Sequence, residues 1–275
     1  MSDRVLVLAY HSHNVSGQDY ASNDQVAFAE DLRQLTVNGY SLVSLSDVAD
    51  MLDRHVELPA RAVALTCDDG PETDFHGVAD PRFGLLPGLA AILDQQRRQG
   101  RFSVGFAPLT AFVIADPEAR REMEQVCLDG RPWLGQSWWQ GALTSGLIQI
   151  GNHGWDHRHP QLARYRQLSD AAAGFAAVRD RDAADFQIAQ ACAYLGHHAP
   201  GPGLVSFAYP FGHADDYLSE SYLPEHGPGL GLRAAYTTEP EAVHRGSYRW
   251  RLPRFVCGAH WRSPEEFAAL LRSAP

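Results

Sequence analysis

The 275-residue sequence contains no lysine, so its 23 basic residues are all arginines, and they are scattered without forming a basic stripe. With 33 acidic residues, the formal net charge is −10. Proteins that bind nucleic acids usually present clustered basic side chains to the phosphates. The charge pattern therefore argues against a nucleic-acid partner.

Cysteine is scarce, and the four that occur, at positions 67, 127, 192 and 257, form no C-x-x-C pair. A disulfide framework normally shows closely and regularly spaced cysteines in a short chain. We therefore expect reduced thiols.

Long apolar runs are also missing. The first apolar run, residues 5–9, has the length of a core strand and is too short for a signal peptide or a membrane span. The sequence thus predicts no transmembrane segment and a cytoplasmic location, with the inner face of the membrane as a further possibility.

No internal repeat, Ser/Gly-rich linker or charge block divides the chain. We expect a single domain over residues 1–275, with a long inserted loop around residues 107–146. The sequence does not indicate the oligomeric state.

Apolar runs alternate with amphipathic stretches along the chain, which predicts an α/β fold with a mainly parallel sheet. Asn23 is a plausible cap for the first helix, and Gly39 a plausible stop. The predicted strands are residues 5–9, 41–45, 62–65, 102–106, 147–150, 205–209 and 233–236. The predicted helices are residues 24–38, 46–52, 85–99, 169–196 with a break near Asp180, and 264–272.

Two groups of polar residues follow predicted strands. Asp68 and Asp69 come after the strand at 62–65, and His153 and His157 come after the strand at 147–150. The carboxyl ends of such strands are where ligands bind in α/β folds. If the second segment turns helical, the i, i+4 spacing places both imidazoles on one face.

One carboxylate and two imidazoles can hold a divalent metal and leave positions open for water and substrate. Each group alone has an ordinary explanation: Asp-Asp-Gly-Pro is common in turns, and the pair could be packed or surface histidines among the 13 in the chain. Their joint occurrence after strands favours a metal site and metal-assisted hydrolysis.

Three motifs in order resemble the polysaccharide deacetylase family, which is also called the NodB-homology domain or carbohydrate esterase family 4. Residues 66–70 (Thr-Cys-Asp-Asp-Gly) are similar to its first motif, with Cys67 in place of phenylalanine. Residues 150–157 resemble the second motif and residues 207–212 the third. The resemblance covers nearly the whole chain and implies a distorted (β/α) barrel with fewer than eight strands.

Residues 7–11 (Val-Leu-Ala-Tyr-His) resemble the opening of the poly-N-acetylglucosamine deacetylase-like subgroup, whose barrel is circularly permuted. The resemblance implies a divalent metal ion, with zinc expected first and cobalt, nickel, manganese or iron as alternatives. It implies these roles: Asp69, His153 and His157 as metal ligands, Asp68 as general base, His11 as general acid, and the backbone near Phe211, with Tyr209, at the oxyanion or substrate.

The third motif departs from the family at Ala208, where an arginine that holds the base aspartate is usual. Arg254 is a candidate replacement because a guanidinium can bind a carboxylate through two hydrogen bonds. His13 competes with His11 for the general-acid role. His159 is a second-layer or loop residue in our interpretation.

Trp133, Trp138 and Trp139 lie in the predicted inserted loop. Tryptophan faces suit the C–H faces of sugar rings, but the three could equally form a small core beneath their own loop.

The leading hypothesis is a metal-dependent hydrolase that removes an N-acetyl (N-acyl) group from an amino sugar of a polysaccharide or glycoconjugate precursor. A deformylase or cyclic amidohydrolase and an O-acetyl esterase could use the same site. A homologue that binds metal or sugar without turnover is the alternative of a different class.

Overall fold

Parallel strands form the centre of the fold. The computed structural model describes residues 3–100, 109–201 and 205–273. Neighbouring strands run in the order β1, β3, β6, β7, β8 and β9, all parallel. Their bounds are β1 Arg4–Tyr10, β3 Ala62–Cys67, β6 Leu109–Val113, β7 Ile148–Asn152, β8 Ser206–Ala208 and β9 Ala234–Tyr236. All six residues of β3 are buried, as expected of a parallel strand with neighbours on both sides.

A seventh strand closes the sheet. A bridge between Tyr236 and Leu252 joins β9 to the segment before β11 (Phe255–Val256), and β11 pairs in parallel with the end of β1. Two short strands extend the sheet beside this ring: β2 (Ser41–Val43) pairs with the start of β3, and β10 (Val243–His244) runs antiparallel to the start of β1. The predicted distorted barrel with fewer than eight strands is confirmed.

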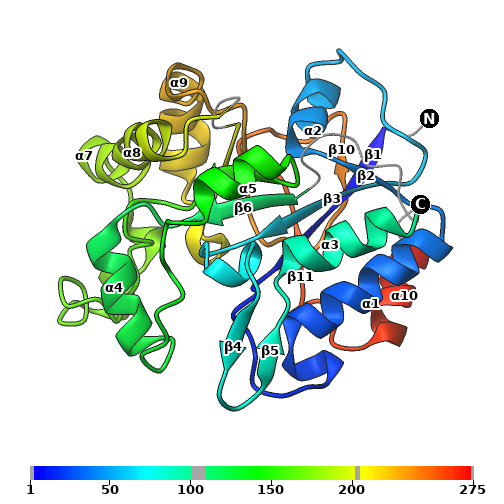
Figure 1. Cartoon of the computed structure of the whole chain (residues 1–275). Helices are drawn as coiled ribbons and strands as arrows, with labels where there is room; N and C mark the ends of the chain where they lie inside the picture. The colour runs from blue at the N-terminus through cyan, green and yellow to red at the C-terminus, as the bar shows by residue number, and fades with distance from the viewer. Residues whose placement is uncertain (1–2, 101–108, 202–204, 274–275) are drawn as a thin grey trace.

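Helices cover the outside of the barrel. In Figure 1, α1, α3 and α10 lie on one side, and α7, α8 and α9 lie at the far end of the sheet. The bounds are α1 Asp24–Val37, α2 Leu45–Leu52, α3 Leu89–Arg98, α4 Pro117–Val126, α5 Trp139–Ser145, α6 Asp170–Ala173, α7 Arg181–Ala184, α8 Gln190–His198, α9 Leu223–His226 and α10 Pro264–Ser273. The predicted cap of α1 is confirmed, because the Asn23 side chain accepts hydrogen bonds from the backbone of Gln25 and Val26.

The predicted helix at 85–99 was wrong at its start. Gly84–Leu86 is strand β5, which pairs antiparallel with β4 (Val78–Asp80), and α3 begins only at Leu89. Pro87 and Gly88 separate the two elements, and Gly88 has φ +83°, a conformation that a helix cannot contain. The hairpin β4–β5 extends below the barrel (Figure 1).

The stretch predicted as a long inserted loop contains regular structure. Strand β6 belongs to the barrel, and α4 and α5 follow it. The predicted strand at 102–106 lies outside the described residues. The predicted helix at 169–196 is interrupted after α6, and from Arg181 it continues through a π-helical turn at Asp185–Ala189 to His198.

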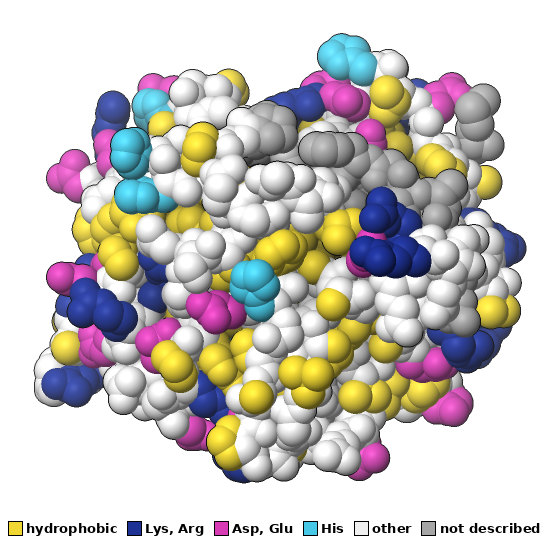
Figure 2. Space-filling view, viewed as in Figure 1, with side chains coloured by type: hydrophobic (Ala, Val, Ile, Leu, Met, Phe, Trp, Pro, Cys, Tyr) yellow, Lys and Arg dark blue, Asp and Glu magenta, His cyan; other side chains and the backbone are white. Residues whose placement is uncertain are grey.

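Charged side chains do not form a broad patch of one sign on the face shown in Figure 2, where acidic and basic groups are interspersed. Within the described ranges, no helix is both long enough and apolar enough to cross a lipid bilayer.

A buried carboxyl group fixes the end of β1. Asp31 of α1 accepts hydrogen bonds from Tyr10 (3.0 Å), from Trp261 (3.0 Å) and from Tyr20. Burial raises the pKa of Asp31 to about 7, although these hydrogen bonds oppose the shift. Since Tyr10 directly precedes His11, this cluster helps to fix the strand end that carries a candidate catalytic residue.

The stability contributed by protonated Asp31 should depend on pH. It is complete below pH 4, where the unfolded chain also holds the proton, and is lost as pH rises toward 7. We expect the unfolding free energy of the wild type, relative to Asp31→Asn, to fall by up to about 4 kcal/mol between pH 4 and 8. Urea unfolding across this range measures it.

Glu30→Gln is the matched control on the same helix. Hydrogen bonds from Arg33 lower the pKa of Glu30, so its stabilising effect is present at neutral pH and is lost in acid. If the difference in unfolding free energy between the wild type and Asp31→Asn does not change with pH, the raised pKa of Asp31 is contradicted.

Candidate active site

The first acidic pair lies where β3 ends. Asp69 has φ +74° and Gly70 has φ +73°, so the chain turns sharply directly after Asp68. A Cβ on Gly70 would lie 2.6 Å from Cγ1 of Val113, so glycine also permits the close approach of β6. The turn directs Asp69 toward the ends of the neighbouring strands.

His153 and His157 follow β7, but not on a helix. His157 has φ +60° and lies in an irregular turn, so the condition for the helical i, i+4 arrangement is not met. His153 donates from Nδ1 to the backbone oxygen of Ala208 (2.9 Å), which leaves its Nε2 free to face Asp69. The residue at the position of the usual arginine thus contributes a backbone contact.

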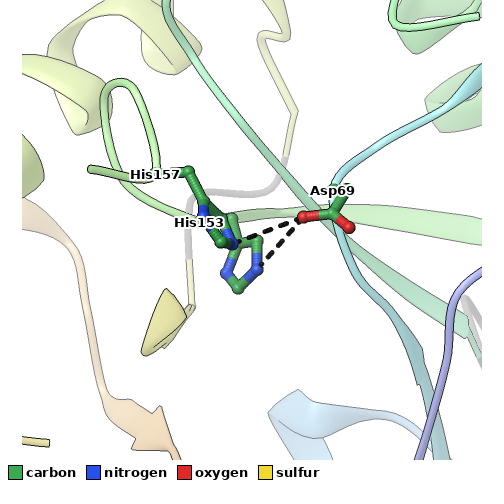
Figure 3. A group of neighbouring side chains, drawn as sticks. All are labelled: Asp69, His153 and His157. Carbon is green, nitrogen blue, oxygen red and sulfur yellow. Dashed lines mark ion pairs between the residues drawn. The ribbon is translucent and has the colours of Figure 1, made fainter. Parts of the chain in front are cut away.

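The three side chains converge on one point (Figure 3). Oδ1 of Asp69 lies 3.6 Å from Nε2 of His153 and 3.5 Å from Nε2 of His157. Two ligands of one tetrahedral ion, at bond lengths of about 2.0–2.2 Å, lie about 3.3–3.6 Å apart. The donor set and its spacing therefore fit a divalent metal, and the group could hold an ion.

The electrostatics of these groups suit metal ligation. Burial lowers the pKa of His157 to about 3, and neighbouring His153 adds to the shift. Burial would raise the pKa of Asp69, but His157 and the other nearby histidines outweigh it and hold that pKa below its usual value. At neutral pH the site thus presents a carboxylate and a neutral imidazole, the forms that bind metals.

Arg254 holds Asp68 through two hydrogen bonds. Its Nη1 donates to Oδ1 (2.7 Å) and its Nη2 to Oδ2 (2.8 Å), and the guanidinium also donates to Thr66 Oγ1 and the Thr237 backbone oxygen. Both side chains are buried. Burial acts to raise the pKa of Asp68, but the charge of Arg254 outweighs it and lowers that pKa. Arg254 thus occupies the orienting position that Ala208 cannot fill.

His11 and His13 both approach the acidic pair from the loop after β1. Nε2 of His13 lies 3.6 Å from Oδ2 of Asp69, whereas the backbone N–H of His11 donates to Asp24 (2.8 Å). The Nδ1 atoms of both rings are buried without a hydrogen-bond partner among the described residues. Both histidines are therefore placed where they could act on a bound substrate.

The third motif contributes a strained turn. Phe211 has φ +58°, and its exposed ring lies 4.5 Å from that of His157. Tyr209 does not line the cavity at the site; it is buried, and its hydroxyl donates to the backbone of Trp250 (2.7 Å). A direct substrate contact by the Tyr209 side chain is therefore not supported.

All three tryptophans of the 107–146 stretch are buried. Trp138 and Trp139 join the main core, and Trp133 joins a smaller apolar cluster beside α4. They serve packing and not sugar stacking, but the small separate core that we considered applies to Trp133 alone, because Trp138 and Trp139 pack into the main core.

A cavity of about 680 Å³ contains the site. His11, His13, Asp68, Asp69, His153 and His157 line it together with Phe211. Two further lining residues, Cys127 and Arg131, were not predictable from the sequence, because they lie between regular elements in a stretch with no motif.

Comparison with solved structures supplies the deciding observation for the fold. No protein-family model and no curated protein matches the sequence. IcaB from Ammonifex degensii superposes with a TM-score of 0.67 at 20% identity, over 100% of this chain and 98% of that one. A polysaccharide deacetylase from Bacillus cereus superposes with a TM-score of 0.60 at 17% identity, over 98% of this chain and 69% of that one.

The chain has the polysaccharide deacetylase fold. The Streptococcus pyogenes deacetylase PplD, whose structure contains acetate, has the same fold; its TM-score is 0.64 at 18% identity, and 98% of each chain is covered. The predicted resemblance is thus confirmed for the fold over the full length of the described chain.

Proposed function

We propose that this protein is a metal-dependent hydrolase that removes the N-acetyl group from an amino sugar of a polysaccharide or glycoconjugate precursor. One observation carries the proposal: an Asp-His-His group with the spacing of metal ligands and a carboxylate held by an arginine line one cavity at the carboxyl end of the barrel strands. The fold, which deacetylases such as PplD share, supports the same chemistry.

Asp69, His153 and His157 would hold the metal, with zinc favoured by the His₂Asp donor set and cobalt, nickel, manganese or iron able to replace it. When bound, a divalent ion lowers the pKa of water and polarises the acyl carbonyl. The remaining steps fall to the protein's own side chains.

Asp68 would accept the proton of the attacking water. Its Oδ2 lies 3.9 Å from Nε2 of the proposed ligand His153, next to the position where water would be activated. Arg254 fixes the direction of the carboxylate and keeps it ionised. A fixed carboxylate near its target is the geometry that general-base catalysis needs.

His11 would donate a proton to the departing amine, with His13 as the competing donor. The backbone N–H at Phe211 would stabilise the oxyanion, because the positive φ of this residue gives the turn an unusual backbone orientation at the cavity.

An acetate-release assay tests the proposal, with N-acetylglucosamine oligomers as the amide and acetylated xylan as the ester. We expect the amide to be hydrolysed, and Asp69→Asn to lower turnover about 10³-fold or more, since the loss of a ligand removes the ion that activates water. The surface variant Asp216→Asn, whose side chain is 78% exposed, should match the wild type.

Each other outcome decides between the alternatives. Hydrolysis of the ester alone would indicate an esterase. Release of formate from formamides would indicate a deformylase. Turnover that persists in Asp69→Asn, or none on any substrate, would contradict the proposal.

A further inference from the structure

One arginine lines the cavity of the proposed metal site, and among the described residues its terminal amino groups (Nη1 and Nη2) make no hydrogen bond that would hold the fold together. Arg131 is the one lining residue with a permanent positive charge among those that the structure describes. Its Nε lies 3.1 Å from Oδ2 of Asp80, and its guanidinium carbon lies 4.7 Å from the ring centroid of Trp133. The side chain is only 15% exposed, and its contacts with Asp80 and Trp133 orient it.

Asp80 holds Arg131 from one side only. Asp80 is buried at the end of β4, and its Oδ1 accepts the backbone N–H groups of Arg82 (2.7 Å) and Phe83 (3.1 Å). The carboxylate is thus fixed by the β4–β5 hairpin, and its nearest approach to Arg131 is through Nε. The two terminal amino groups are left for another partner.

The terminal amino groups of two buried arginines, Arg120 and Arg254, donate hydrogen bonds within the protein. Arg120 donates from Nη1 to the Leu134 backbone and from Nη2 to Gln136, and Arg254 donates from both to Asp68. In the described parts of the chain, the side chain of Arg131 contacts Asp80 through Nε and the ring of Trp133, and neither terminal amino group donates a hydrogen bond. A guanidinium in this state is an anion-binding group, since its planar pair of donors matches a carboxylate or phosphate.

A short series of contacts links Arg131 to the proposed metal ligands. The rings of His157 and His159 lie 5.8 Å apart, and Sγ of Cys127 lies 3.7 Å from Nε2 of His159. Arg131 lies four residues after Cys127, and its backbone N–H donates a hydrogen bond to the backbone oxygen of Leu128. The anion would therefore belong to the sugar that is deacylated or to a neighbouring one.

We propose that Arg131 forms an anion subsite of this cavity, and that the substrate is an N-acylated amino sugar carrying a carboxylate or a phosphate. The proposal rests on the proposed function and specifies its substrate class. Because the net charge of the chain is −10, the protein as a whole does not attract anions, so recognition of an acidic group depends on this local cation.

Three substrates with the same N-acetyl group test the subsite: N-acetylglucosamine, its 3-O-lactyl ether and its 6-phosphate. We expect the wild type to favour one acidic sugar over the neutral one by about 10- to 100-fold in kcat/KM, mainly through KM, as one charge-assisted contact supplies. Which acidic sugar is favoured distinguishes the carboxylate from the phosphate.

Arg131→Gln should abolish this preference, because the acidic sugars lose a contact that the neutral sugar does not make. Arg131→Lys is the second variant, in case the glutamine leaves Asp80 unpaired and the fold suffers. A lysine can keep the ion pair with Asp80 but has no second donor pair for the ligand, so the preference should again be lost. Arg82→Gln, on the same hairpin but outside the cavity lining, should behave as the wild type.

Binding of the deacylated sugars, glucosamine, its 3-O-lactyl ether and its 6-phosphate, separates this proposal from the proposed function, because calorimetry needs no turnover. Tighter binding of an acidic amine, lost in both Arg131 variants, would support the subsite even if no sugar is hydrolysed. Equal binding of neutral and acidic amines, or a preference that survives in Arg131→Lys and Arg131→Gln, would overturn it.

Discussion

Asp68→Asn is expected to lower kcat by about 10²- to 10⁴-fold, which is the contribution of a positioned general base. The asparagine has nearly the same shape, so the cavity and the proposed ligands Asp69, His153 and His157 should be undisturbed. Bound metal should therefore stay near the wild-type level while acetate release is lost.

The pairing of these two readouts separates the role of Asp68 from that of Asp69. Elemental mass spectrometry gives the metal content, and acetate release under saturating substrate gives kcat. Loss of metal in Asp68→Asn would make Asp68 a ligand instead of a base. A kcat within tenfold of the wild type would exclude both roles.

Arg254→Met is expected to cost about 3–5 kcal/mol of unfolding free energy, because it leaves the buried carboxylate of Asp68 without its partner. Acetate release should fall as well, since the base is no longer held in position. Urea unfolding and the acetate assay measure the two effects.

The double variant Asp68→Asn with Arg254→Met is the matched control. It removes the unpaired charge, so it should be more stable than Arg254→Met alone, while its activity stays as low as that of Asp68→Asn. If the single variant Arg254→Met loses less than about 1 kcal/mol, the pair contributes far less than a buried ion pair should.

The position of the candidate site was predictable because parallel strands share an edge. Asp68 follows β3 and His153 follows β7, and β6 alone separates these strands in the sheet. Side chains at the carboxyl ends of such strands meet whatever the details of the loops. The sequence therefore predicted the group around Asp69, although it did not determine whether His157 would lie on a helix or, as in the structure, in an irregular turn.

The backbone turns at the site and the position of Arg254 could not be predicted from the sequence pattern. The positive φ values of Asp69, His157 and Phe211 come from turns that packing against other strands imposes, and side-chain periodicity carries no record of them. Arg254 was a candidate on chemistry alone, because only the closure of the barrel through β11 brings it to Asp68.

Arg131 shows the limit of motif reasoning most clearly. It belongs to no motif, and its counter-ion Asp80 lies in a hairpin that the sequence did not predict. The packing of this hairpin beside the segment after α4 shows which guanidinium N–H groups of Arg131 remain without a partner in the described parts of the chain.

A metal titration of chelator-treated protein tests the central claim most directly. Zinc would be added in steps, and bound metal and acetate release would be measured at each step. We predict that activity is absent without metal, rises in proportion to bound zinc and saturates at about one ion per chain, while Asp69→Asn neither binds that ion nor regains activity. Full activity in metal-free protein, or equal zinc binding by Asp69→Asn, would contradict a metal-dependent deacetylase centred on Asp69, His153 and His157.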